Sequence, residues 1–116
     1  AGGWSIYRTS GNLHFDYFKQ GGALGQGPTF NGSDANKWVH LAVVQNSAGV
    51  STYKNGKFQA NMSQKIHNNS TVAWQDLMLG ASNATSPTRY SNVYLDEYRI
   101  SNSDRTADSS DQMYTG

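Results

Sequence analysis

Short apolar runs, separated by turns rich in glycine and asparagine, recur along this chain, and they predict β-strands. Leu13, Phe15 and Tyr17 recur at every second position, so they share one face of a strand. The dipeptide Asn55-Gly56 supplies the two positive φ angles of a type I′ hairpin turn. We therefore predict an antiparallel all-β structure with strands at residues 4–8, 13–18, 38–45, 50–54, 57–60, 73–81 and 93–100.

Polar segments between these strands predict loops at 19–36, 61–70 and 82–92, the first of them with a short strand near Thr29. Near the C-terminus, residues 106–114 are predicted to form a short helical turn with Thr106 as its N-cap. Four aromatic side chains fall within predicted strands and are expected in the core: Trp4, Phe15, Trp38 and Tyr53.

Length, composition and charge narrow the function classes. At 116 residues the chain can bury a core of its own, so we expect residues 1–116 to form a single domain. It holds no cysteine, which excludes disulfides, zinc–thiolate sites and thiol nucleophiles. The net charge is +1 and Lys and Arg do not cluster, so no nucleic-acid partner is expected. No apolar run reaches membrane-spanning length, so we expect no membrane insertion.

The acidic residues do not form the pattern of a glycoside hydrolase, which needs two carboxylates flanking the scissile bond. The sole glutamate, Glu97, follows Asp96 on a predicted strand, where neighbouring side chains point to opposite faces. The chain contains no Gly-x-Ser-x-Gly elbow, and its histidines lie on separate predicted elements. We therefore expect no enzyme activity. A hydrolase fragment, whose second carboxylate lies in sequence outside this chain, stays an alternative.

Four segments, in the same order, resemble parts of laminin G-like, concanavalin A-like lectin/glucanase jelly-roll domains. They are Trp38-Val-His-Leu-Ala-Val-Val44, Lys54-Asn-Gly-Lys57, Leu77-Met-Leu-Gly-Ala81 and Leu95-Asp-Glu-Tyr-Arg-Ile-Ser101. The resemblance implies an antiparallel β-sandwich of the jelly-roll type, closed by a short C-terminal helical turn. The N-terminal strands that open such domains are missing here, so we expect the chain to be a piece of a longer, modular protein.

The resemblance implies a non-catalytic binding or adhesion function, in which loops at the rim of the sandwich recognise glycans on a cell or matrix surface. Trp and Tyr rings offer a flat apolar surface with a polar end, and Asn and Arg side chains can bond sugar hydroxyls. We therefore expect a ligand-binding set in loops and at strand ends: Trp74, Asn83, Arg89, Tyr90 and Asn92. Single sites of this kind are weak, so we expect a multivalent assembly with an extracellular, cell-surface or virion-exposed location.

Two further expectations follow from the resemblance. The first is an alternative function as a structural or decoration module of a virion, tail fibre or surface filament, in contact with neighbouring protein subunits. The second is a calcium ion at Asp96, held by that carboxylate, backbone carbonyls and water. In the other interpretation, Asp96 accepts a hydrogen bond from a neighbouring loop or pairs with Arg99.

Overall fold

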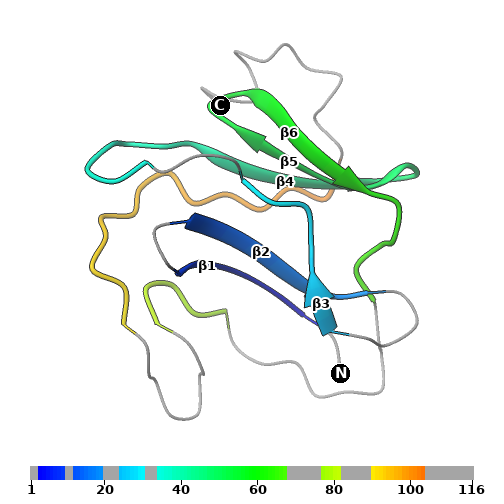
Figure 1. The fold of residues 1–116 in the computed structure, drawn as a ribbon, viewed down its shortest axis with the longest axis horizontal. Coiled ribbons are helices and arrows are strands. Elements are labelled where there is room, and N and C mark those ends of the chain that lie inside the picture. Colours follow the sequence, from blue (N-terminus) through cyan, green and yellow to red (C-terminus); the bar gives the residue numbers. More distant parts are fainter. Residues whose placement is uncertain are drawn as a thin grey trace. The chain divides into compact units, whose positions relative to one another are not determined.

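The computed structural model describes residues 3–9, 12–19, 24–30, 34–67, 77–81 and 90–103. The strands assigned there are β1 (Trp4–Thr9), β2 (Asn12–Phe18), β3 (Leu24–Gln26), β4 (Leu41–Asn46), β5 (Gly49–Lys54) and β6 (Lys57–Met62). The chain divides into two compact units, one of Ala1–Asn69 with Ser103–Gly116 and one of Ser70–Asn102. All of these strands belong to the first unit, where they form two antiparallel sheets (Figure 1).

The first sheet has the strand order β1-β2-β3. Ile6 of β1 lies opposite Phe15 of β2, and Tyr7 lies opposite His14. Phe15 and Tyr17 are 1% and 0% exposed, whereas Asp16 between them is only half-buried. The alternation predicted for residues 13–18 is therefore confirmed, with one face of β2 turned to the core.

The second sheet has the order β4-β5-β6, and its β5–β6 connection is the hairpin turn predicted from Asn55-Gly56. Asn55 has φ 50° and Gly56 has φ 77°, as a type I′ turn requires. The Asn55 side chain also accepts a hydrogen bond from the backbone N–H of His40 at 2.9 Å, and the Asn55 N–H donates to the His40 carbonyl. Both contacts hold the turn against the residues that precede β4, and the predicted turn is confirmed.

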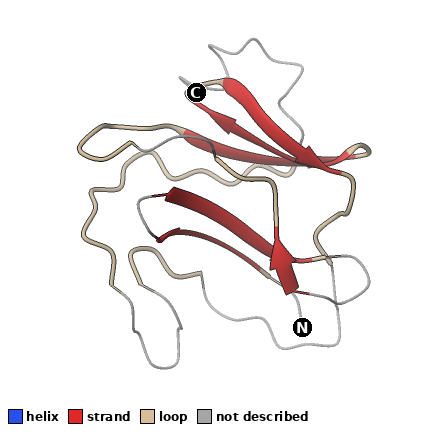
Figure 2. Cartoon of the chain, viewed as in Figure 1, coloured by secondary structure: helices blue, strands red, loops and turns tan. Residues whose placement is uncertain are grey.

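The two sheets share one hydrophobic core, made of Phe15, Tyr17, Phe30 and Val50. The buried Thr52 hydroxyl donates to the Thr29 carbonyl at 3.0 Å, which fixes the segment before Phe30 against β5. The Tyr17 hydroxyl donates to the Gln64 carbonyl at 2.7 Å and so joins the first sheet to the chain after β6. The fold is thus the predicted antiparallel β-sandwich. Figure 2 shows its strands and loops, with no helix in the described ranges and hence no helical membrane span there.

Two tryptophans expected in the core are exposed instead. Trp38 is 71% exposed because it precedes β4, which begins at Leu41 rather than at residue 38. Trp4 is 44% exposed, although its ring centroid lies 6.4 Å from that of Phe15. Its strand, β1, is at the edge of the described sheet, so the ring has core neighbours on one side only.

Two predicted strands are absent from the described residues, since neither 77–81 nor 93–100 is assigned as strand. Gly80 has φ 79° and Glu97 has φ 52°, and such left-handed residues interrupt an extended backbone. A backbone hydrogen bond from Ser91 N–H to the Gly80 carbonyl, 2.7 Å long, joins these two segments of the second unit. Residues 73–76 and the helical turn predicted at 106–114 lie outside the described residues.

The loop predicted at 19–36 contains a strand, but at a different place from the one expected. Strand β3 forms at Leu24–Gln26, where it pairs with Asp16 to Phe18 of β2. Phe30, next to the expected position at Thr29, makes only an isolated bridge with Leu13. The consequence is that β3 places Gln26 beside Asp16 on one face of the sheet and Gly25 beside Tyr17 on the other.

Candidate functional site

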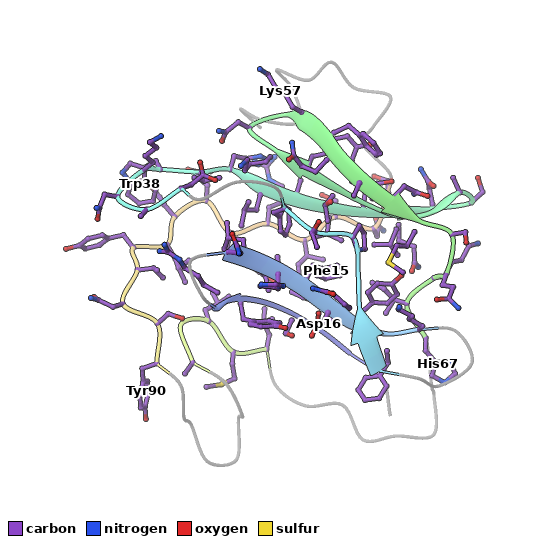
Figure 3. All side chains as sticks on the ribbon, in the orientation of Figure 1. Phe15, Asp16, Trp38, Lys57, His67 and Tyr90 are labelled. Carbon is purple, nitrogen blue, oxygen red and sulfur yellow. The ribbon has the colours of Figure 1, made fainter. Side chains whose placement is uncertain are left out.

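The outer face of the first sheet, which points away from the core, gathers polar and aromatic side chains from all three strands. Phe15 and Asp16, labelled in Figure 3, are neighbours on β2 and leave it on opposite faces. Tyr7 of β1 lies opposite His14, and Gln26 of β3 lies opposite Asp16. Residues directly opposite one another in an antiparallel pair share a face. We call Tyr7, His14, Asp16 and Gln26 the sheet-face cluster.

Contacts between these side chains join the cluster into one network. The Tyr7 hydroxyl donates to Asp16 Oδ2 at 2.9 Å. The Tyr7 and His14 rings stack with centroids 5.4 Å apart and an interplanar angle of 18°. Gln26 Nε2 lies 3.1 Å from His14 Nδ1, within hydrogen-bond distance. Rings and polar groups therefore hold one another in place across three strands.

The electrostatics of the cluster are set by Asp16. Its bond from the Tyr7 hydroxyl, together with partial burial and the carboxylate charge, raises the pKa of Tyr7. The other carboxylate oxygen, Oδ1, is shielded from solvent and has no hydrogen-bond partner among the described residues. Asp16 thus accepts one internal donor at Oδ2, and a second lone pair of that oxygen can accept another hydrogen bond.

The cluster has the properties of a binding surface. Tyr7 is 41% exposed, and Ser5 and Gln26, which lie on the same face on either side of Asp16, are exposed as well. A ligand lying flat on the sheet would meet an aromatic ring beside hydrogen-bond donors and acceptors. In the described ranges, no group of three or more His, Cys, Asp or Glu residues could hold a metal ion.

The ligand-binding residues predicted from the sequence fall largely outside the described ranges: Trp74, Asn83 and Arg89. Tyr90 and Asn92 are described, and both are exposed, with Tyr90 at 77%. They flank Ser91, whose N–H bonds the Gly80 carbonyl, so a backbone contact supports their segment. The binding role predicted for these residues stays a prediction.

Asp96, the predicted calcium ligand, is exposed, and its Oδ1 accepts a hydrogen bond from the backbone N–H of Glu97 at 2.8 Å. Calcium takes six to eight oxygen ligands, and the described residues offer no acidic cluster around Asp96. Calcium binding there stays a prediction. Asp96 and Glu97 do not lie on a strand, so the alternation that would point their side chains to opposite faces does not apply to them. That alternation was one argument against a pair of catalytic carboxylates, and the absence of enzyme activity stays a prediction.

The sheet-face cluster was not predicted from the sequence, although part of its signal was there. Asn12, His14 and Asp16 alternate with the apolar Leu13, Phe15 and Tyr17, which marks a polar outer face on β2. Gln26 had no such signal, because its segment reads as a loop rich in glycine. Its role depends on the β2–β3 register, which only the folded chain defines.

Comparison with known families gives one match. The model of a laminin G type family, described as the concanavalin A-like lectin/glucanases superfamily, matches residues 1–109. Comparisons with curated proteins and with solved structures give no match. The match covers both sheets and the described part of the second unit.

Proposed function

Because the chain belongs to the concanavalin A-like lectin/glucanase superfamily, we propose that it is a non-catalytic module that binds glycans on a cell or matrix surface. Members of this superfamily often bind carbohydrate or protein. The sheet-face cluster supports the first of these ligands. The proposed location is extracellular, on a cell surface or on a virion.

The observation that supports carbohydrate binding most directly is the combination of aromatic rings and polar side chains on one sheet face. The Tyr7 ring is 41% exposed and stacks on the half-buried ring of His14. Sugar rings have apolar C–H faces that pack on such surfaces, while their hydroxyls both donate and accept hydrogen bonds. Asp16 and Gln26 stand at bonding distance from this ring pair and supply the polar contacts.

A shallow face of this kind binds each sugar weakly, because little of the ligand is enclosed. Several copies presented together raise the effective strength through local concentration, by about 10²–10⁴-fold. We therefore place the domain in a multivalent assembly. A tetramer made through a terminal biotin reproduces that situation in an assay.

The test is binding of this tetramer to an array of glycans, followed by two variants. Tyr7→Ala removes a ring of the sheet-face cluster, and Tyr90→Ala removes the exposed tyrosine of the predicted loop site. We expect Tyr7→Ala to weaken binding by about tenfold or more, as alanine substitution of a stacking ring does, and Tyr90→Ala to leave it unchanged.

The opposite ranking of the two variants would move the site to the loops and keep the function. Retention of full binding by both variants would exclude both sites. A wild-type tetramer that binds no glycan on the array would overturn the proposal. A thermal melt of each variant confirms that loss of binding is not loss of folding.

A second candidate function, as a structural module in contact with neighbouring protein subunits, is favoured by a different feature. The segment 93–100 exposes several large apolar side chains: Val93, Tyr94, Leu95, Tyr98 and Ile100. Exposed apolar groups of this size, when they gather, mark contact surfaces between proteins. A blank glycan array, together with protection of these residues from hydrogen exchange in the native assembly, would support this function instead.

A further inference from the structure

Resting on the glycan-binding function proposed above, we propose that the sheet-face cluster takes uncharged sugars and rejects sulfated, sialylated and uronic acid sugars. The observation behind this is the charge of the outer face, which Asp16 alone determines among the described residues of the sheet. The proposal names the ligand class of the site, and it can fail while glycan binding itself holds.

The cationic side chains of the first sheet lie on its other face. Arg8 pairs with Leu13, which packs against the core, so Arg8 is on the core side of β1. The Lys19 side chain lies beside Gly25, 3.2 Å from the position of an added Cβ, and Gly25 pairs with the buried Tyr17. Neither positive charge stands on the outer face to attract an anion.

The outer face of β2 and its partners carries no Lys or Arg among its described residues. Its described side chains, besides Asp16, are Ser5, Tyr7, Asn12, His14, Phe18 and Gln26. An anionic sugar placed on this face would meet the carboxylate at short range, with no Lys or Arg among the described residues of the face to compensate. Like charges brought together without screening oppose binding, and partial burial of the carboxylate strengthens that repulsion.

Hydrogen-bond capacity leads to the same ligand class. A carboxylate only accepts hydrogen bonds, and so do sulfate and carboxylate groups on a sugar. Asp16 accepts from Tyr7 at Oδ2, whereas Oδ1 is shielded from solvent and is not offered to a ligand. A neutral sugar hydroxyl can donate to the second lone pair of Oδ2 and accept from a neighbouring N–H, so it suits Asp16 and the His14–Gln26 pair together.

The test compares each neutral glycan that the tetramer binds with its sulfated and sialylated counterparts, and dextran with dextran sulfate, at neutral pH. We expect the wild type to bind the anionic member of each pair at least about tenfold more weakly. Asp16→Asn keeps the shape of the side chain and removes its charge, so it should shrink that ratio to about twofold or less.

Asp34→Asn is the matched control, because it removes the same charge from a site where Asp34 pairs with Lys54 at 2.8 Å. It should leave the ratio at the wild-type value. Equal or tighter wild-type binding of the anionic sugars would overturn this inference and leave glycan binding intact. An equal effect of the two variants would assign the selectivity to net charge and overturn the role of Asp16. No binding to any sugar would refute the proposed function instead.

Discussion

Gly27 is a position at which the structure predicts a clear loss of stability from one added carbon in the core. A Cβ there would lie 2.7 Å and 2.8 Å from ring atoms of Tyr17 and 2.9 Å from a ring atom of Phe15. Both rings belong to the core and are 0% and 1% exposed, so neither has room to retreat. The Gly27 N–H also donates to the Phe15 carbonyl at 2.8 Å, which ties its backbone to β2.

Two effects of Gly27→Ala oppose each other. Overpacking of a filled core costs about 1–3 kcal/mol. Alanine restricts the unfolded chain, which raises the free energy of unfolding by about 0.4–1 kcal/mol, because the φ of Gly27 is not in the left-handed region. Because three ring atoms would lie under 3.0 Å from the new Cβ, the overpacking cost is about 2–3 kcal/mol, and the net loss in free energy of unfolding is about 1–2.5 kcal/mol. For a domain of this size that lowers Tm by roughly 4–10 °C.

Gly25→Ala is the matched control, since Gly25 lies two residues earlier in the same segment. Its added Cβ would meet only the end of the flexible Lys19 side chain, at 3.2 Å, which can move aside. We expect its stability to stay within about 0.5 kcal/mol of wild type. Urea unfolding and thermal melts followed by circular dichroism measure both variants. A Gly27→Ala protein as stable as wild type, or a Gly25→Ala protein equally destabilised, would refute the assigned packing.

Three further predictions follow. Asn55→Ala should lower the free energy of unfolding by about 1–2 kcal/mol, because it loses the hydrogen bond from His40 N–H and places alanine at φ 50°. Urea titration measures this loss, with Gln59→Ala as the control variant. Burial raises the pKa of Tyr17 above 10.0. The stability that the neutral Tyr17 hydroxyl contributes is therefore complete below pH 10.0 and is lost as pH rises through the raised pKa. Tyr17→Phe should reduce this alkaline loss of stability in unfolding curves measured across pH. Asp16→Asn should lower the pKa of Tyr7 toward 10.0. Ultraviolet absorbance titration measures this pKa, with Tyr7→Phe identifying the Tyr7 signal. An unchanged titration would contradict the Tyr7–Asp16 hydrogen bond.

The parts of the fold that the sequence predicted are those with local causes. The Asn55-Gly56 turn depends on the φ preferences of two adjacent residues, and both angles are as expected. The core face of β2 depends on alternation within one strand, and Phe15 and Tyr17 are buried. Neither feature requires knowledge of distant partners.

The parts that the sequence did not predict depend on partners far along the chain. Leu24-Gly25-Gln26 has no strand pattern of its own and becomes β3 because β2 offers it a free edge. Trp38 has the apolar character of a core residue, but its burial depends on which element covers it. The candidate site follows the same division, since Asp16 was visible in the alternation while its meeting with Tyr7 and Gln26 required the register.

Each sheet is a meander, in which every strand pairs with its neighbour in the sequence. Contacts of that kind close only short loops and cost little chain entropy, so each meander can assemble before the other is in place. We therefore expect the slow event in refolding to be the docking of two formed meanders rather than the search for strand partners. Rates of folding should accordingly respond more to truncation of Val50, at the docking surface, than to changes within either hairpin turn.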